Sequence, residues 1–115
     1  VVLDSATGFY RLARHDGDEG ETLRRVGRQV THLLSLARKH DVAVVLTNKV
    51  FTEPDADRVR PLRGNTLEHC TGTILRLDRF RGGNRRATLE KHRAKAAGET
   101  ATFRITGTGL ADAER

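Results

Sequence analysis

The chain has little of what would cross-link it or place it in a membrane. Its one cysteine, Cys70, excludes a disulfide within the chain. No apolar run approaches the roughly 20 residues that a membrane-spanning helix needs, and the opening Val1-Val2-Leu3-Asp4 lacks the positive leader of a signal peptide. These absences favour a cytoplasmic protein with no membrane partner.

Aromatic residues are scarce as well: the sequence has four Phe, one Tyr and no Trp, and it has no Met. The apolar share of 37% is too high for a disordered chain but thin for a self-contained globular domain. A length of 115 residues fits one domain or part of one. We therefore expect a folded unit that depends on further structure around it.

Charge is distributed unevenly along the sequence. Residues 1–57 carry eight Lys/Arg and nine Asp/Glu, a net charge of −1, whereas residues 58–115 carry thirteen and six, a net charge of +7. Arginine accounts for 17 of the 21 Lys/Arg residues, and its planar guanidinium binds phosphates through two hydrogen bonds at once. The second half therefore favours a polyanionic partner, with a solvated basic surface as the alternative.

Hydrophobic patterns predict the order strand, helix, strand in the first half. Val1-Val2-Leu3 is an apolar run that ends at an acid. Residues 8–21 are predicted to form a loop with a short helical piece around 9–12, and helical spacing of apolar residues runs from 22 to about 39. Residues 42–46 are continuously apolar, as a parallel strand buried on both faces requires. This order is that of a βαβ unit.

The second half is predicted to form antiparallel strands. Residues 52–64 show no periodicity and are predicted to form a mobile loop, followed by a short helical turn at 65–70. Alternating segments at 73–77, 87–90 and 102–105 predict three strands, the first two joined by a turn at Gly82-Gly83-Asn84. The fold class is therefore α/β: a parallel βαβ unit followed by an antiparallel β-meander edge.

Polar residues follow both predicted parallel strands where these end. Asp4 closes the first strand, and a carboxylate at a strand end can hold the water shell of a magnesium ion beside a nucleotide. Thr47-Asn48-Lys49 closes the second strand, and open α/β sheets place their ligands at this carboxyl edge. The alternatives are a structural aspartate and an ordinary polar turn.

Specific runs of the sequence resemble the RecA/RadA recombinase family. They occur in the family's order and spacing: Asp4-Ser5-Ala6-Thr7-x-x-Tyr10-Arg11, Leu33-Leu34-x-Leu36-Ala37, Val42-Ala43-Val44-Val45-Leu46-Thr47-Asn48 and Gly64-Asn65-x-x-x-His69. Residues 64–69, 79–86 and 89–93 are most similar to the archaeal RadB group of that family. The resemblance implies that residues 1–115 form the C-terminal part of a RecA-like P-loop NTPase core. It also implies a DNA-binding accessory protein of homologous recombination and DNA repair, with weak ATPase activity.

The resemblance further assigns roles to individual residues. It implies nucleotide contacts for Asp4, Ser5, Thr47 and Asn48, with Asp4 holding magnesium through water. It places residues 8–20 and 50–64 in two DNA-binding loops, with single strands favoured. The DNA-binding residues that it implies are Tyr10, Arg11, Arg14, Lys49, Arg58, Arg60 and Arg63. A RadA-type recombinase and further copies of the protein are the other partners that it implies.

The sequence also departs from the family pattern. Lys49 stands where the family usually has glutamine, Arg63 replaces a glycine, and Ala96-Ala97-Gly98 replaces a Pro-rich segment. The phosphate-binding loop G-x-x-x-x-G-K-[ST] does not occur in these 115 residues. ATP and Mg²⁺ are therefore expected to bind only together with a phosphate-binding half, and this chain alone is expected to be inactive as an ATPase.

Two other functions fit the sequence. One is a catalytically degenerate module that docks on a RadA-type recombinase, and the other is a nonspecific basic binder of nucleic acid. A rival basic patch lies on the predicted hairpin and consists of Arg79, Arg81, Arg85 and Arg86. The five His residues lack zinc-site spacing with Cys70, whose side chain is predicted to be a buried thiol.

Overall fold

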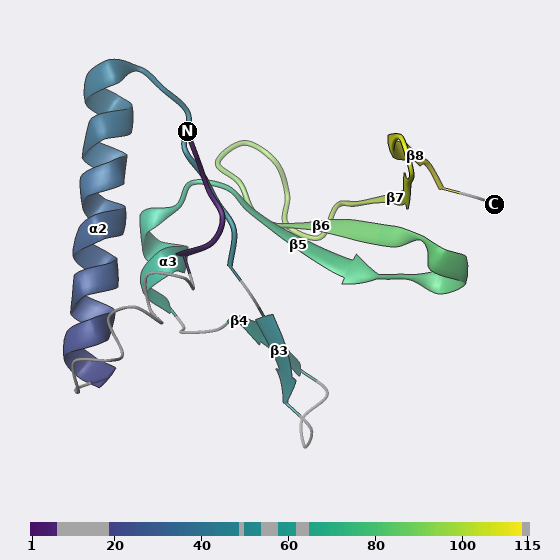
Figure 1. Ribbon diagram of the computed structural model, residues 1–115, viewed down its shortest axis with the longest axis horizontal. Helices are drawn as coiled ribbons and strands as arrows, with labels where there is room; N and C mark the ends of the chain where they lie inside the picture. Colours follow the sequence, from purple (N-terminus) through teal and green to yellow (C-terminus); the bar gives the residue numbers. More distant parts are fainter. Residues whose placement is uncertain (7–18, 49, 54–57, 62–64, 114–115) are drawn as a thin grey trace. The chain divides into compact units, whose positions relative to one another are not determined.

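The computed structural model describes residues 1–6, 19–48, 50–53, 58–61 and 65–113 (Figure 1). These residues fall into two compact units, Val1–Cys70 and Thr71–Arg115. The helical piece expected around residues 9–12 lies outside the described ranges. Within those ranges, no helix is long and apolar enough to cross a membrane.

A parallel strand pair with a helical crossover organises the first unit. β1 (Val2–Leu3) pairs in parallel with β2 (Val45–Leu46), and α2 (Glu19–His40) lies between them in the chain. The amide of Val45 donates to the carbonyl of Val1 at 2.8 Å and extends this ladder by one bond. The βαβ order predicted from the sequence is confirmed.

α2 forms because apolar residues recur at helical spacing along one side of it. Val30 is 5% exposed, and Leu33, Leu34 and Ala37 are half-buried. Asp41 has a φ of 52°, in the left-handed region, directly after the last helical residue, and a left-handed residue commonly ends a helix. The helix therefore covers the predicted range and starts three residues before it.

The parallel strands are shorter and more exposed than the sequence predicts. β2 has two residues, and Val45 is 54% exposed, whereas a continuous apolar run predicts burial on both faces. Val1 and Val2 are 69% and 71% exposed. In the described ranges β1 and β2 hydrogen-bond only to each other, and the described elements leave parts of both strands exposed. The prediction of a fully buried strand is therefore wrong for the described chain.

A hairpin follows β2 in a region where the sequence predicts a mobile loop. β3 (Val50–Glu53) pairs antiparallel with β4 (Arg58–Pro61), and Phe51 lies opposite Arg60 in the register. Valine and aromatic residues in these segments favour extended pairing, and the proline is the last residue of an edge strand, which tolerates it. The mobile-loop prediction is therefore wrong for residues 52–53 and 58–61.

α3 (Asn65–Cys70) confirms the short helix predicted at 65–70. It lies beside α2, where the hydroxyl of Thr31 is 4.0 Å from the Sγ atom of Cys70. The Cys70 side chain is half-buried rather than buried as predicted, because it lies at the end of this short helix.

A four-stranded antiparallel meander makes up the second unit. Its strands, in hydrogen-bonding order, are β5 (Ile74–Arg79), β6 (Arg85–Lys91), β7 (Thr100–Thr106) and β8 (Gly109–Asp112). The first three confirm the predicted strands. The sequence patterns do not reveal β8, because it has four residues and follows a two-residue turn. A parallel βαβ unit followed by an antiparallel meander confirms the predicted fold class.

The turn between β5 and β6 has the backbone conformation that its glycines allow. Gly82 and Gly83 have φ values of 63° and 82°, in the region that other residues rarely adopt. The amide of Phe80 donates to the carbonyl of Asn84 at 2.8 Å and closes the turn. The predicted Gly-Gly-Asn turn is confirmed.

The two faces of the meander differ in polarity. Side chains of paired residues lie on the same face of a sheet, and the register places the exposed aliphatic residues of β5, β7 and β8 together. Leu75, Leu77, Ile105 and Leu110 are 60%, 64%, 63% and 75% exposed. The alternate positions of β5, such as Arg76, belong to the opposite, polar face.

Candidate functional site at the ends of β1 and β2

Thr47, the residue after β2, is bonded to the end of β1 through three of its groups. Its amide donates to the carbonyl of Leu3 at 3.0 Å, and its carbonyl accepts from the amide of Ala6 at 2.9 Å. Its hydroxyl donates to Oδ1 of Asp4 at 2.6 Å. The two polar strand ends that were predicted to share one sheet edge therefore meet there.

The site combines an exposed carboxylate with a backbone that neighbouring residues fix through burial and hydrogen bonds. Asp4 and Thr47 are exposed, Ser5 and Asn48 are half-buried, and Ala6 is 3% exposed. The peptide bond between Asp4 and Ser5 is cis. Because buried Ala6 and the bonded Thr47 fix the backbone near the carboxylate, Asp4 stands at a defined position and is open to solvent.

The donor groups at this edge suit a hard cation that keeps its water. The four predicted nucleotide-site residues offer a carboxylate, two hydroxyls and an amide oxygen, and Mg²⁺ prefers oxygen ligands. Only one of them is a carboxylate, and the described ranges hold no group of three His, Cys, Asp or Glu residues that could bind a metal. The donor set therefore fits a magnesium ion that Asp4 contacts through water, and it does not fit an all-protein metal cage.

The structure describes part of the predicted DNA-binding set. Arg58 and Arg60 occupy alternate positions of β4, opposite Glu53 and Phe51, and alternate positions lie on one face of a strand. The remaining members lie outside the described residues: Tyr10, Arg11, Arg14, Lys49 and Arg63. The two described arginines thus share a face of the ribbon that follows Thr47 in the chain.

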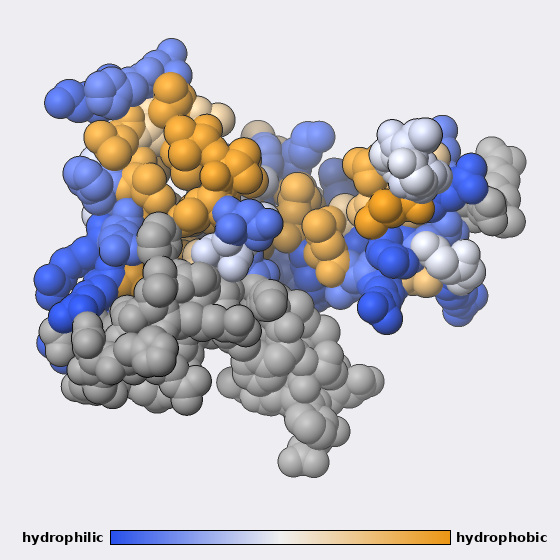
Figure 2. Space-filling view, in the orientation of Figure 1, coloured by the Kyte–Doolittle hydropathy of each residue, from blue (hydrophilic) through white to orange (hydrophobic). Residues whose placement is uncertain are grey.

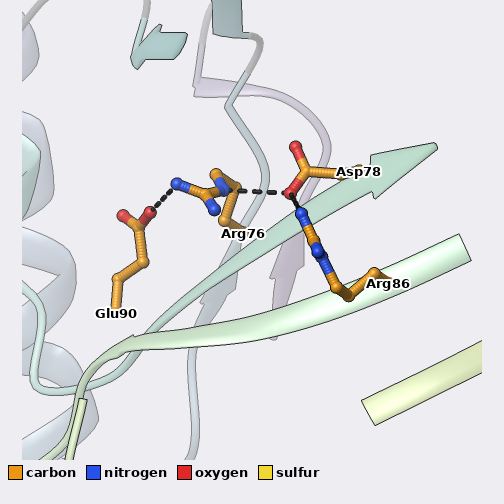
Figure 3. A network of polar contacts seen from close by, with 4 residues as sticks. All are labelled: Arg76, Asp78, Arg86 and Glu90. Atoms are coloured by element: carbon orange, nitrogen blue, oxygen red, sulfur yellow. Dashed lines mark hydrogen bonds and ion pairs between the residues drawn. The ribbon is translucent and has the colours of Figure 1, made fainter. Parts of the chain in front are cut away.

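Charged side chains on the polar face of the β5–β6 hairpin form ion pairs with one another (Figure 3). Arg76 donates through Nε to Oδ2 of Asp78 at 3.0 Å and through Nη1 to Oε1 of Glu90 at 2.8 Å. Nη2 of Arg86 lies 3.9 Å from the same oxygen of Asp78, and its guanidinium lies 4.9 Å from the centre of the Phe80 ring. Two arginines and two acids therefore balance in charge on this face.

The other arginines of the rival patch differ in whether their guanidinium groups already have partners among the described residues. Nη1 of Arg85 donates to the carbonyls of Gly83 and Asn84 at 3.1 Å and 3.3 Å. Arg79 and Arg81 are exposed and have no ion pair with another described residue. Half of the four-arginine patch is therefore open to an outside anion.

Comparison with known proteins decides the family of the chain. The Rad51 family model matches residues 1–113. The DNA repair and recombination protein RadB of Halobacterium salinarum is 67% identical over 113 residues, which cover 96% of this chain and 48% of that protein. The chain belongs to the RadB group of the Rad51 family. The protein of the same name from Methanococcoides burtonii is 40% identical over 111 residues, which cover 96% of this chain and 49% of that protein.

A solved RadB structure supports the same assignment. The crystal structure of the RadB recombinase matches with a TM-score of 0.71 and 37% identity, over 99% of this chain and 51% of that one. The resemblance to RecA/RadA recombinases, and to RadB among them, is therefore confirmed, and the fold is that of a RecA-like core fragment. The chain spans about half the length of the RadB proteins that it matches.

The predicted site leaves out one basic surface of this RadB-group chain. Arg24, Arg28, Arg38 and Lys39 are exposed along α2. The signal is present in the sequence, because no acid occurs from 22 to 40. Helical periodicity marks these positions only as lying off the apolar stripe, so it does not single them out as a site.

Proposed function

We propose that the chain acts in DNA recombination and repair as part of an accessory protein that binds DNA, and that it binds ATP and Mg²⁺ together with a phosphate-binding half. The observation that carries the nucleotide part is the 2.6 Å hydrogen bond from Thr47 to Asp4. It holds a carboxylate at the carboxyl edge of a parallel strand pair, where α/β sheets bind nucleotides. The relatives' name, DNA repair and recombination protein RadB, supports the biological role.

The residues at the nucleotide edge have separate tasks. Asp4 orders the water shell of the magnesium ion. Thr47 fixes the position of the Asp4 carboxylate through the hydrogen bond that its hydroxyl donates. Ser5 and Asn48 add polar groups beside them. ATP, when bound, supplies the phosphates whose charge the magnesium ion neutralises. Because these residues form no phosphate cradle, the 115-residue chain should not hydrolyse ATP, and the complete core should do so weakly.

DNA binding is proposed at the β3–β4 hairpin and at residues 8–20. β3 begins three residues after Thr47, so the hairpin follows the nucleotide edge closely along the chain. Arg58 and Arg60 contact phosphates from β4. Single-stranded DNA is the expected form, because Tyr10 and Arg11 provide a ring and a guanidinium that stack on unpaired bases.

Calorimetry with Mg-ATP tests the nucleotide part. The 115-residue chain should give no heat of binding, whereas a chimera that joins it to the amino-terminal half of the H. salinarum RadB should bind. In the chimera, Asp4→Asn should weaken binding about 10- to 100-fold, as loss of an outer-shell ligand does. Glu99→Gln, at an exposed acid of the second unit, is the control and should bind normally. Micromolar binding by the chain alone, or normal binding by the Asp4→Asn chimera, contradicts the proposal.

The salt dependence of DNA binding tests the DNA part. In the chimera, log affinity for single-stranded DNA should fall with log salt at a slope of roughly −2 to −3, as expected for three or four phosphate contacts. The double variant R58A/R60A should flatten the slope by about 1.4. R79A/R81A, on the β5–β6 hairpin, is the matched control and should keep the slope. If only the control flattens it, the assignment to the loops is wrong and DNA follows the second unit.

The same chimera separates this function from the two alternatives. A degenerate module that docks on a RadA-type recombinase without its own nucleotide should retain that partner in the Asp4→Asn variant, and it should not bind DNA by itself. A nonspecific basic binder should bind RNA and DNA with equal affinity and equal salt slope. The proposed function requires DNA binding by the chimera and a preference for single-stranded DNA over RNA of the same sequence.

A further inference from the structure

From residue 22 onward α2 carries positive charge and no acid, and its two acids, Glu19 and Glu21, lie in its first turn. From 22 to 40 the sequence has five Lys/Arg, two His and no Asp or Glu. Arg24, Arg28, Arg38 and Lys39 are all exposed, and we call these four residues the α2 ridge. Figure 2 shows hydrophilic residues at the upper end of α2 and along its lower outer side, with hydrophobic residues between them.

Helix geometry places the members of the α2 ridge on one side of α2. At about 100° per residue, Arg28 and Lys39 lie roughly 40° and 60° from Arg24 around the axis, and Arg38 lies about 40° on its other side. At about 1.5 Å per residue, the row from 24 to 39 is about 22 Å long. The ridge therefore consists of two pairs of cations on one side of a rigid helix, with a rise of about 15 Å from Arg28 to Arg38.

Helix stability does not explain the α2 ridge. Arg24 and Arg28 are like charges four residues apart, which repel each other and destabilise a helix. None of the four ridge residues forms an ion pair with another described side chain. The helix dipole favours cations only in the last turn, so it accounts for Arg38 and Lys39 but not for the other two. An external anion would relieve this repulsion.

We infer that the α2 ridge is a second DNA-binding surface, which contacts the phosphate backbone of duplex DNA. The inference rests on the proposed DNA-binding function and adds a site to it. No Phe, Tyr or Trp occurs from 22 to 40, so the ridge lacks the large aromatic rings on which unpaired bases commonly stack. Arginine binds phosphate oxygens through two hydrogen bonds, and cations at fixed positions on a rigid helix suit the regularly spaced phosphates of a duplex better than a flexible single strand.

A charge-removing and a charge-preserving variant test the inference in the chimera with the H. salinarum RadB half. R24Q/R28Q/K39Q removes three ridge charges, and R24K/R28K/K39R keeps them. Gln and Lys both favour helix, so the circular dichroism at 222 nm of both variants should match the parent. The readout is the slope of log affinity against log salt for a duplex of about 30 base pairs and for single-stranded DNA.

The inference predicts a selective loss. R24Q/R28Q/K39Q should flatten the duplex slope by roughly 2 to 3, at about 0.9 per lost phosphate contact, and weaken duplex affinity about 10-fold or more at low salt. The charge-preserving variant should keep the duplex slope, and both variants should keep the single-strand slope. An unchanged duplex slope in the charge-removing variant overturns the inference. If the charge-removing variant keeps the duplex slope but no longer binds an acidic protein partner, the inference is also overturned, and the ridge is a protein interface.

Failure of the ridge and failure of the proposed function give different results. If R58A/R60A leaves the single-strand slope unchanged while the ridge variant flattens the duplex slope, the hairpin assignment fails and the ridge stands. If R58A/R60A flattens the single-strand slope while the ridge variant changes nothing, the proposed function stands and the ridge is only a solvated helix face.

Discussion

The contacts within the two units of this chain differ in how far apart their partners lie along the sequence. In the first unit, the side-chain bond from Thr47 to Asp4 spans 43 positions of sequence, and the parallel strands that it joins have two residues each. In the second unit, each strand pairs with the next one along the chain, and β6 and β7 have seven residues each. The longest strands of the described chain are thus paired locally, whereas the long-range pairing depends on a few specific bonds.

The units also differ in how they are stabilised. Among the residues whose burial is described, the buried hydrophobic ones are Ala6 and Val30, and both belong to the first unit. Every described residue of the second unit is at least partly exposed. We conclude that packing matters most in the first unit, and that strand ladders and turns matter most in the second.

Val30→Ala should have the largest effect, because it removes two methyl groups from the buried side of α2. The expected loss is about 2 kcal/mol in the free energy of unfolding of the first unit. Circular dichroism at 222 nm during urea unfolding reports it, since α2 is the long helix of the described chain. Val42→Ala, at a residue that is 45% exposed, is the matched control and should cost less. Equal losses would show that packing does not dominate the first unit.

Gly83→Ala should be next, because an L-residue at a φ of 82° is strained. The expected cost is about 1 kcal/mol, confined to the second unit. Faster hydrogen exchange of the Phe80 amide, which closes the turn, measures it. Gly107→Ala is the control, since a Cβ there meets nothing within 4 Å and no left-handed φ is involved. A similar response in both variants would show that the conformation of this turn does not stabilise the meander.

Thr47→Val should weaken the long-range link of the first unit by about 1 kcal/mol, since one hydrogen bond to a carboxylate is lost at an exposed site. The amide of Ala6, which donates to the Thr47 carbonyl, should then exchange faster. Thr47→Ser keeps the hydroxyl and should restore the parent rate. If serine and valine behave alike, the hydroxyl does not hold the strand ends together.

Glu90→Gln should have the smallest effect, below about 0.5 kcal/mol, because its ion pair with Arg76 is partly exposed at 33% and 37%. Thermal unfolding at low salt measures this effect. At about 1 M salt the difference from the parent should vanish, because the screening length shrinks to about 3 Å. A cost above 1 kcal/mol that persists at high salt would mean that side chains, rather than ladders and turns, stabilise the meander.

Local signals explain which parts of the fold the sequence predicts correctly. The apolar spacing along α2 and the alternation in β5, β6 and β7 each lie within one element, so periodicity finds them. The β3–β4 hairpin escapes this method because two prolines, three arginines and three acids within 53–63 obscure a short apolar pattern. β8 escapes it because four residues are too few to show alternation.

The candidate site was predictable in type but not in its bonding. Acid and polar residues at two strand ends indicate a shared edge, and the structure joins Asp4 with Thr47 there. The sequence does not show that Thr47 bonds to Asp4 with its hydroxyl, because that contact depends on register between strands far apart in the chain. Strand burial was overestimated for the same reason: an apolar run indicates what a strand can bury, not which neighbours cover it.

The open turn between β5 and β6 has a practical consequence for engineering. At Gly82 and Gly83 an added Cβ would meet no atom within 4 Å, and residues 80–83 are exposed. Lengthening a loop costs little, about 0.6 kcal/mol for each doubling, because closure entropy grows only with the logarithm of length. A peptide inserted between the two glycines therefore disturbs few contacts. This turn is the position at which an epitope or a fluorescent label can be added to the second unit while β5 and β6 remain paired.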